Sequence, residues 1–505
     1  PGRPPPLPNR PSMLWCALYL PDLALQVFTR GRSDSPPLAV LGARPRQRVV
    51  AVDAAAMARG VAAGHSRAGA LALAPDLCLI ERDLRQELAT LTDIASWAGC
   101  FTPSVSLDPP DTLLLEIQAS LRLFGGLAPL CDAIRAGLDE LGFSAQLAVA
   151  PTPLAARWLA RGAAGSLLQT PARLPDALAP LPLGLLAHES TVGADSLELL
   201  AGIGARCMAD VRRLPRSGLA RRQAGAVITL LDRAYGVLPD PRPWFVPPEH
   251  YSSRLPLPAP SDQTDILLFG LRRLLTGLSG WLDARQAGLE RFTLVLEFER
   301  LGSIHRGHEP ESRIEIVLGA LSRDMARFQL LTREHLSRKA LPAPVEALRL
   351  EADAPQPMAP PRTDFFDVQA SEDNDPGLLL ATLRARLGNA AVHCLAPHPD
   401  HRPEHAWRQT DPQASTLQPG AARQAAALPN APRPLWLLPE PRPIACPAPE
   451  NILAGPERIE SGWWDGSDGE ISRDYFVASR QDHSLVWVFR ESRPPYGWFL
   501  HGYFS

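Results

Sequence analysis

The amino-acid sequence predicts an α+β multidomain protein, and three observations lead to that fold class. Segments typical of strands and helices alternate from the first apolar run to about residue 165, as expected of a mixed sheet-and-helix domain. A helical stretch with two closely spaced glycines follows, and proline-rich segments then separate further ordered stretches. A chain of 505 residues holds roughly three or four domains if each takes about 150 residues.

The first ordered region is expected over residues 13–165, after a proline-rich leader at 1–12 that is typical of disorder. Apolar periodicity gives its elements, and turn residues give their ends. Ser66, for example, is placed to cap a helix that Pro75 ends. Strands are expected at 14–20, 38–41, 49–52, 77–80, 113–117 and 147–150, and helices at 23–28, 53–60, 66–74, 83–97, 127–141 and 152–161.

The central strand of this region has an acid at each end, in Asp111-Thr112-Leu-Leu-Leu-Glu116. A carboxylate at the edge of a rigid strand is suited to Mg²⁺, which prefers oxygen ligands. Two-metal phosphoryl transfer, however, needs several carboxylates around ions about 3.5–4 Å apart. Thr112 cannot supply the second charge beside Asp111, so the pattern suggests a metal site that has lost ligands.

Residues 197–235 predict a helix-hairpin-helix motif. Glycines at its turn allow a phosphate to approach the backbone, and helix N-termini direct N–H groups at such an anion. An ordinary helical hairpin with solvent-facing arginines is the alternative. The residues assigned to a nucleic-acid contact are Gly202, Ile203, Gly204, Arg206, Arg212, Arg213, Arg216, Arg221 and Arg222.

The second half of the chain alternates proline-rich and ordered stretches. Its last 50 residues contain aromatic runs that predict the strands of a small β unit. The expected parts are a helical region at 166–238, a tether at 239–260, a small α+β domain at 261–352, a linker at 353–376 and a C-terminal region at 377–505. Within the last region we expect a helix at 378–387 and a proline-rich stretch to about residue 450.

Composition excludes several classes of protein. The 51 basic and 54 acidic residues balance, so a nucleic-acid surface has to be local. Seven cysteines without short spacings predict free thiols, neither a disulfide framework nor a zinc site. No apolar run approaches 18 residues and no signal peptide is evident, which predicts a soluble, cytoplasmic protein without metal or other cofactor.

The order of these parts resembles the Y-family translesion DNA polymerases over about residues 13 to 351. The stretch from Gly60-Val61 to Leu77 is similar to the family's fingers motif, and residues 147–157 are similar to a palm segment. Residues 197–236 resemble the family's helix-hairpin-helix thumb. The resemblance implies a palm and fingers at 13–165, a thumb at 166–238 and a little finger at 261–352.

The metal-binding positions of the family are changed here. Its first strand carries two aspartates, where this chain has Tyr19 and Pro21. Its second motif carries an Asp-Glu pair, where this chain has Asp111-Thr112 or, in another alignment, Asp108 followed by proline. The glutamate is missing in both alignments, so Asp111 is interpreted as vestigial.

The positions that bind the incoming triphosphate are changed as well. A tyrosine and an arginine of the fingers correspond to Ala54 and Met57. The family's first palm lysine corresponds to Pro153, and only Arg157 keeps a cation. Losses at four independent places leave nothing to hold two metal ions or neutralise a triphosphate, and they predict a pseudo-polymerase without catalytic residues.

A Y-family-like chain that lacks the metal and triphosphate ligands and has a long C-terminal extension resembles the ImuB family, the non-catalytic members of a bacterial mutagenesis cassette. The stretches 400–408, 455–465, 473–476 and 497–503 are similar to that family's C-terminal signatures. The resemblance implies a hub in damage-induced translesion synthesis and SOS mutagenesis. Its implied partners are primer-template DNA, the sliding clamp, a DnaE-type error-prone polymerase and the RecA-like accessory protein ImuA.

Candidate partner-binding residues lie in the linker and the tail. In the family that this chain resembles, clamp-binding peptides end in two apolar or aromatic residues, with Gln a few residues before, and Arg362-Thr-Asp-Phe365-Phe366 has the aromatic pair with Arg in place of Gln. The alternative is that this pair packs on its own little finger. The aromatic residues assigned to partner binding in the tail are Trp463, Trp464, Trp498 and Phe499.

Two further patterns have a structural interpretation that we favour. His398, His401 and His405 stand near acids, but the prolines between them prevent a common helix, so we predict a solvated segment without metal. The tail tryptophans are expected in the core of the β unit more than as a base-stacking surface. The function predicted is a scaffold; the alternative is an active Y-family polymerase with an atypical metal site.

Overall fold

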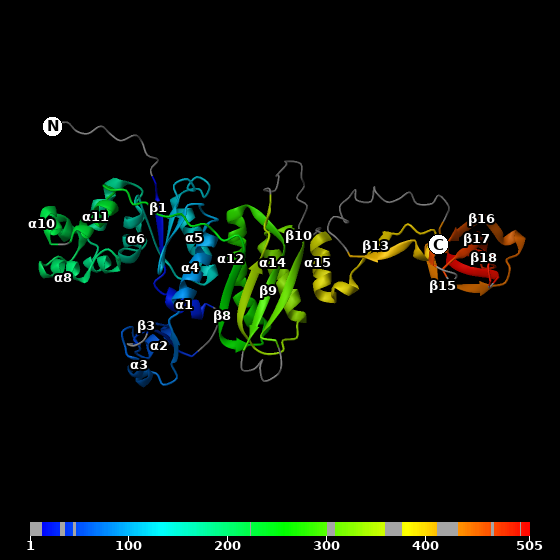
Figure 1. The fold of residues 1–505 in the computed structure, drawn as a ribbon, viewed down its shortest axis with the longest axis horizontal. Helices are drawn as coiled ribbons and strands as arrows, with labels where there is room; N and C mark the ends of the chain where they lie inside the picture. The colour runs from blue at the N-terminus through cyan, green and yellow to red at the C-terminus, as the bar shows by residue number, and fades with distance from the viewer. Residues whose placement is uncertain are drawn as a thin grey trace, which may run out of the picture. The chain divides into compact units, whose positions relative to one another are not determined.

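The computed structural model describes residues 13–30, 36–43, 47–222, 224–299, 309–358, 376–411, 433–465, 469–494 and 496–504. The chain divides into two units, Pro1–Ala370 and Ser371–Ser505, which are described separately. Both units mix helices and sheets (Figure 1), so the predicted α+β multidomain class is confirmed.

The palm is a four-stranded antiparallel sheet in the order β5-β6-β1-β7. Its strands are β1 (Trp15–Tyr19), β5 (Val105–Asp108), β6 (Thr112–Glu116) and β7 (Gln146–Ala150), and its helices are α1 (Leu23–Thr29), α4 (Leu84–Ala98), α5 (Leu127–Leu141) and α6 (Pro153–Gly162). Because strand side chains alternate between faces, Cys16 and Leu18 pack in a core with residues of α4 and α5. Trp15 and Ala17 pack on the other side, in a core with residues of α6. Figure 1 shows α6 and the α4–α5 pair on opposite sides of β1.

The fingers are a small sheet of three strands in the order β3-β2-β4. Its elements are β2 (Leu38–Leu41), β3 (Val49–Val52), β4 (Cys78–Glu81), α2 (Ala54–Ala58) and α3 (Arg67–Leu73). Ser66 caps α3 by accepting a hydrogen bond from the Gly69 amide at 3.1 Å, as predicted. Gly60 and Gly64 adopt positive φ angles of 84° and 91°, which glycine tolerates at the turns between these elements.

The thumb consists of short helices grouped in one part of the ribbon (Figure 1). They are α7 (Leu174–Leu178), α8 (Ala194–Gly202), α9 (Met208–Arg213), α10 (Arg216–Arg221) and α11 (Gly225–Ala234). Leu200, Met208 and Val227 are buried in the same core as the α6 face of the palm sheet. The helical hairpin expected at 197–235 is therefore present and rests on the palm.

The little finger has a sheet in the order β10-β9-β11-β8, with β12 added beside β9. Its elements are β8 (Tyr251–Ser261), α12 (Thr264–Arg285), β9 (Ala287–Phe298), β10 (Glu311–Ser322), α14 (Met325–Arg338), β11 (Val345–Ala352) and β12 (Gln356–Pro357). Strand β8 occupies the second half of the tether expected at 239–260, so that part of the expectation is wrong. A strand with several prolines is tolerated there because β8 pairs only with β11, at the edge of the sheet.

The second unit contains a five-stranded antiparallel sheet in the order β15-β19-β18-β17-β16. Its elements are α15 (Pro376–Leu387), the hairpin of β13 (Cys394–Pro397) and β14 (Trp407–Thr410), β15 (Trp436–Ile444), β16 (Ile452–Ser461), β17 (Ile471–Ser479), β18 (Leu485–Glu491) and β19 (Gly497–Tyr503). The predicted β unit is therefore present. The proline-rich stretch to about residue 450 contains three strands, of which β15 is again an edge strand.

The tail aromatics divide between core and surface. Trp498 and Phe499 lie on β19 and pack against the two cores of the sheet. Trp463 and Trp464 lie in a turn after β16 and are 73% and 54% exposed, so the expectation that they form the core is wrong. Gly462 precedes them with φ +84°, and the chain leaves the sheet there before it can bury them.

Candidate functional site at the palm centre and thumb

The palm centre brings together the residues that the sequence assigned to the lost metal site. Tyr19, the last residue of β1, is paired with Thr112, the first residue of β6. Asp111 precedes Thr112, and its carbonyl oxygen accepts a hydrogen bond from the Leu20 amide at 2.8 Å. Pro21 follows in the turn after β1. Asp111 is thus the one carboxylate among these four positions.

Arg161 of α6 fills the space beside that carboxylate. Its Nη2 donates to Asp111 Oδ1 at 2.5 Å and to Thr112 Oγ1 at 3.2 Å. Its guanidinium carbon lies 4.5 Å from the centre of the Tyr19 ring, in a cation–π contact. Thr112 also donates to Asp111 Oδ1, at 2.9 Å. A guanidinium charge, held by an ion pair and an aromatic face, therefore neutralises Asp111.

Helix α6 carries a second arginine, one turn earlier, that is also paired. Arg157 Nη1 contacts Asp108 Oδ2 at 2.6 Å, and its Nη2 pairs with Glu189. Arg242 Nη1 reaches the other oxygen of Asp108 at 3.3 Å. Trp158 donates its indole N–H to Glu189 at 2.7 Å. The cation that the sequence retained for the triphosphate is thus held by two carboxylates of the protein.

Electrostatics support these pairings. Burial by itself lowers the pKa of Arg157, but the charges of Asp108 and Glu189 and their hydrogen bonds raise that pKa above its ordinary value. The pKa of Tyr19 is raised, chiefly by burial and then by the negative charge of Asp111. Tyr19 is therefore a neutral phenol near neutral pH, with no charge to offer a metal ion.

The placement of both arginines follows from local sequence. Thr152 caps α6 by accepting from the Ala155 amide at 3.3 Å. Pro153 takes the first helical position, where a backbone N–H would have no partner within the helix, so proline costs no hydrogen bond there. Positions 157 and 161 are then four residues apart and project from the same face of the helix. That spacing was a signal for Arg161, which the sequence analysis missed along with Glu189 and Arg242.

The fingers present no cation at the two positions that were predicted to correspond to triphosphate ligands. Ala54 begins α2 and is exposed, and Met57 on the same helix is 61% exposed. Arg59, nearby, forms an ion pair with Asp76. This surface is thus uncharged at the two positions in question.

The thumb differs from the palm because its arginines face solvent. Arg206, Arg212, Arg213, Arg216, Arg221 and Arg222 are all exposed. Within the part of the chain that the structure describes, Arg216 alone among them forms an ion pair, with Asp232. Arg212 lies over the Tyr235 ring at 4.4 Å. Most of these side chains are therefore available to an external anion.

The backbone of the thumb turn is already occupied. The amides of Ile203 and Gly204 donate to carbonyls of α8. The amides of Arg206 and Cys207 donate to the Asp210 carboxylate at 2.9 and 3.2 Å, and these bonds lower the pKa of Asp210. A phosphate would therefore meet arginine side chains at this hairpin, in place of the free N–H groups that the sequence analysis expected.

The remaining predictions concern the clamp-binding peptide, metal sites and membrane-spanning helices. Arg362, Phe365 and Phe366 lie outside the described residues, so the clamp-binding prediction stays a prediction. The structure groups no three His, Cys, Asp or Glu side chains for a metal within the described ranges. His405 lies in a short turn at 403–405. In the same ranges, no helix is long and apolar enough to span a membrane.

Comparison with known proteins defines the class first. Residues 26–161 match the model of the impB/mucB/samB family, a Y-family polymerase domain. Residues 26–161 include α2, α3 and all of the palm strands except β1. Over 214 residues, 41% of this chain and 57% of the relative, the chain is 29% identical to DNA polymerase IV of Shewanella denitrificans.

A more extensive likeness is to Protein ImuB of Caulobacter vibrioides strain NA1000 / CB15N. The two are 28% identical over 482 residues, which are 88% of this chain and 100% of the relative. DinB from Sulfolobus solfataricus, a solved structure, covers 69% of this chain with 17% identity and a TM-score of 0.37. The predicted resemblance is confirmed: this chain is similar to Protein ImuB over most of its length and, over residues 26–161, to the impB/mucB/samB domain of Y-family polymerases.

Proposed function

We propose that this protein is a catalytically inactive Y-family homologue that acts as a scaffold in error-prone translesion DNA synthesis. The observation that carries the proposal is the palm centre, where Arg161 pairs with Asp111 and stacks on Tyr19. Two-metal catalysis needs carboxylates that face a pair of cations. Here one carboxylate faces an arginine, and moving that arginine aside would leave a buried cation without its partner.

DNA binding is proposed for the thumb. Its exposed arginines suit phosphate contacts, which give affinity without sequence readout. The protein would then hold primer-template while another enzyme performs nucleotide transfer, and it would do so in the bacterial cytoplasm, at the nucleoid. The likeness to Protein ImuB supports the further partners proposed here: the sliding clamp, a DnaE-type error-prone polymerase and ImuA.

Partner contacts are proposed at two places. Phe365 and Phe366, with Arg362, form the proposed clamp-binding peptide. Trp463 and Trp464 are proposed to bind a second protein, since two adjacent exposed indoles on a turn are typical of an interaction site. Trp498 and Phe499 are half-buried on β19 and pack against the two cores of the sheet.

Primer extension by the purified full chain, in Mg²⁺ and in Mn²⁺, tests the proposal. We expect no extension, together with salt-sensitive binding of the same primer-template and no metal-dependent binding of dNTPs. An Asp111→Ala variant is the control, because any real activity would depend on that carboxylate. Extension by the wild type that Asp111→Ala abolishes would establish the alternative, an active polymerase with an atypical metal site.

A further inference from the structure

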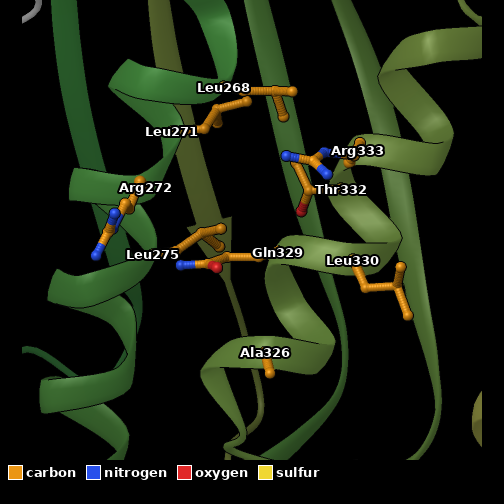
Figure 2. A pocket seen from close by; sticks show the side chains of 9 residues that line it. All are labelled: Leu268, Leu271, Arg272, Leu275, Ala326, Gln329, Leu330, Thr332 and Arg333. Carbon is orange, nitrogen blue, oxygen red and sulfur yellow. The ribbon is translucent and has the colours of Figure 1, made fainter. Parts of the chain in front are cut away.

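A groove lies between α12 and α14, the two helices that cover one face of the little-finger sheet. Its volume is about 360 Å³. Figure 2 shows Leu275 of α12 and Gln329 of α14 approaching each other across it, with Arg333 extending from α14 toward α12. The lining is apolar apart from four polar residues, and consists of Leu268, Leu271, Arg272, Leu275, Ala326, Gln329, Leu330, Thr332 and Arg333.

Two arginines, one from each helix, flank the groove with their charges unpaired. Arg272 and Arg333 are exposed, and neither guanidinium has an ion pair with a carboxylate of the described residues. Most other arginines of this domain are paired, as Arg349 is with Glu297, Glu311 and Glu351. Two free cations beside an apolar floor therefore stand out from the surrounding surface.

Thr332 gives an independent sign of an absent ligand. It lines the groove and is fully buried, yet its Oγ1 has no hydrogen-bond partner in the part of the chain that the structure describes. A buried hydroxyl without a partner costs about 1–3 kcal/mol. A polar group of a bound molecule would remove that cost. Leu330, 37% exposed, would at the same time be covered.

We propose that this groove binds an acidic amphipathic helix of a partner protein. Leucines of the helix would fill the apolar floor, and carboxylates on both sides of them would pair with Arg272 and Arg333, as in other helix-in-groove complexes. Nucleic acid suits the groove less well, because phosphates gain nothing from burial against Leu271 and Leu275. The inference goes beyond the scaffold function above, since it needs neither an inactive palm nor DNA binding.

Binding of a designed probe tests the inference. The probe is a fluorescein-labelled helical peptide of about 16 residues, with leucines on one face and glutamates beside them. We expect saturable binding to the full chain, and a loss of at least about tenfold in affinity for the double variant Arg272→Glu/Arg333→Glu. A Leu330→Gln variant should lose several-fold through the apolar contact alone. All three substitutions are at exposed positions, so the fold is expected to tolerate them.

Matched controls separate the groove from general charge effects. Arg291→Glu/Arg338→Glu reverses two exposed arginines elsewhere in the same domain and should leave affinity within about twofold. Peptides with lysine in place of glutamate, or alanine in place of leucine, should not bind. Equal losses in both double variants, or binding of the alanine peptide, would overturn the proposal.

Two other occupants are outcomes of the same experiment that also overturn it. A labelled single-stranded oligonucleotide that loses affinity only for Arg272→Glu/Arg333→Glu, while the peptide does not bind, would indicate a nucleic-acid ligand. A wild-type chain that dimerises through this surface, with the double variant monomeric in sedimentation, would indicate a second copy of the chain. Primer extension is independent of all these results, so failure here leaves the proposed function untouched.

Discussion

The palm centre and the thumb both contain several arginines, but the two regions use them differently. In the palm, Arg157 and Arg161 point toward carboxylates of the same chain, and their side chains are only 12% and 9% exposed. In the thumb, six arginines face solvent and one of them is paired within the described residues. An arginine that is held in an internal ion pair cannot neutralise the charge of a nucleotide, whereas an exposed arginine can bind a phosphate.

The difference teaches that nucleic-acid contact and metal catalysis make different demands on a polymerase-like fold. Phosphate contacts by exposed side chains need no special geometry. Metal catalysis needs several carboxylates on rigid strands, and the paired strand ends of this palm present Tyr19 and Thr112, neither of which has a carboxylate. In this chain the palm centre has a structural role, because Arg161 ties α6 to the end of β6.

The largest effect is expected from removing Arg161. Arg161→Ala leaves Asp111 partly buried without its cation, and we expect a loss of about 3–5 kcal/mol in the free energy of unfolding. Thermal or urea unfolding of the full chain measures it. Arg213→Ala in the thumb is the control and should cost less than about 0.5 kcal/mol. Similar losses in both variants would remove the contrast between the two regions.

Another carboxylate extends the comparison, because it is partly buried and has no ion pair with the described residues. Asp93 of α4 accepts a hydrogen bond from Ser253 at 2.6 Å, and burial raises its pKa to about 6 from 3.8. The folded state therefore binds this proton more tightly than the unfolded state, so the contribution of Asp93 to stability is full below about pH 4 and is lost as pH rises to about 6.

The substitution Asp93→Asn should remove this pH dependence. Relative to the wild type, the variant should gain stability between about pH 4 and pH 6 by at most about 3 kcal/mol, and the difference should be constant above that window. Unfolding of both proteins at several pH values measures the difference. A constant difference across the whole range would mean that Asp93 titrates normally.

The smallest effect is expected from the thumb, and it should appear in DNA binding with no change in stability. Arg213→Glu/Arg222→Glu should weaken primer-template binding by about tenfold, and should lower the slope of log affinity against log salt by about two. Fluorescence anisotropy across a salt series measures both quantities. Replacing two paired arginines of the little finger, in Arg313→Glu/Arg349→Glu, tests whether any loss of positive charge has the same result.

Local signals in the sequence were sufficient for many elements. Ser66 and Pro75 marked the ends of α3, and the expected helix at 127–141 coincides with α5. Such elements can be predicted because a cap, a stop and an apolar periodicity all lie within the segment itself. The prediction of the thumb hairpin rested in the same way on Gly202 and Gly204, and Gly204 has φ +84°.

Other features depended on neighbours that are distant in the chain. Proline-rich β8 and β15 could not be recognised as strands, because proline is tolerated only where one side of a strand is unpaired, and the position at a sheet edge is not a local property. The exposure of Trp463 and Trp464 was missed for a similar reason. Whether an aromatic run enters a core depends on where the preceding turn directs the chain.

The candidate site likewise has features that can be predicted locally and features that depend on residues distant in the chain. The sequence by itself determined the prediction that the palm lacks the carboxylates and the cations of an active polymerase, because that prediction needs only the residue type at each aligned position. Only the tertiary structure decided what replaced them. Arg161 is separated from Asp111 by 50 residues, and pairing them required α6 to pack across β1 and β7. Long-range packing, and not local preference, formed this ion pair.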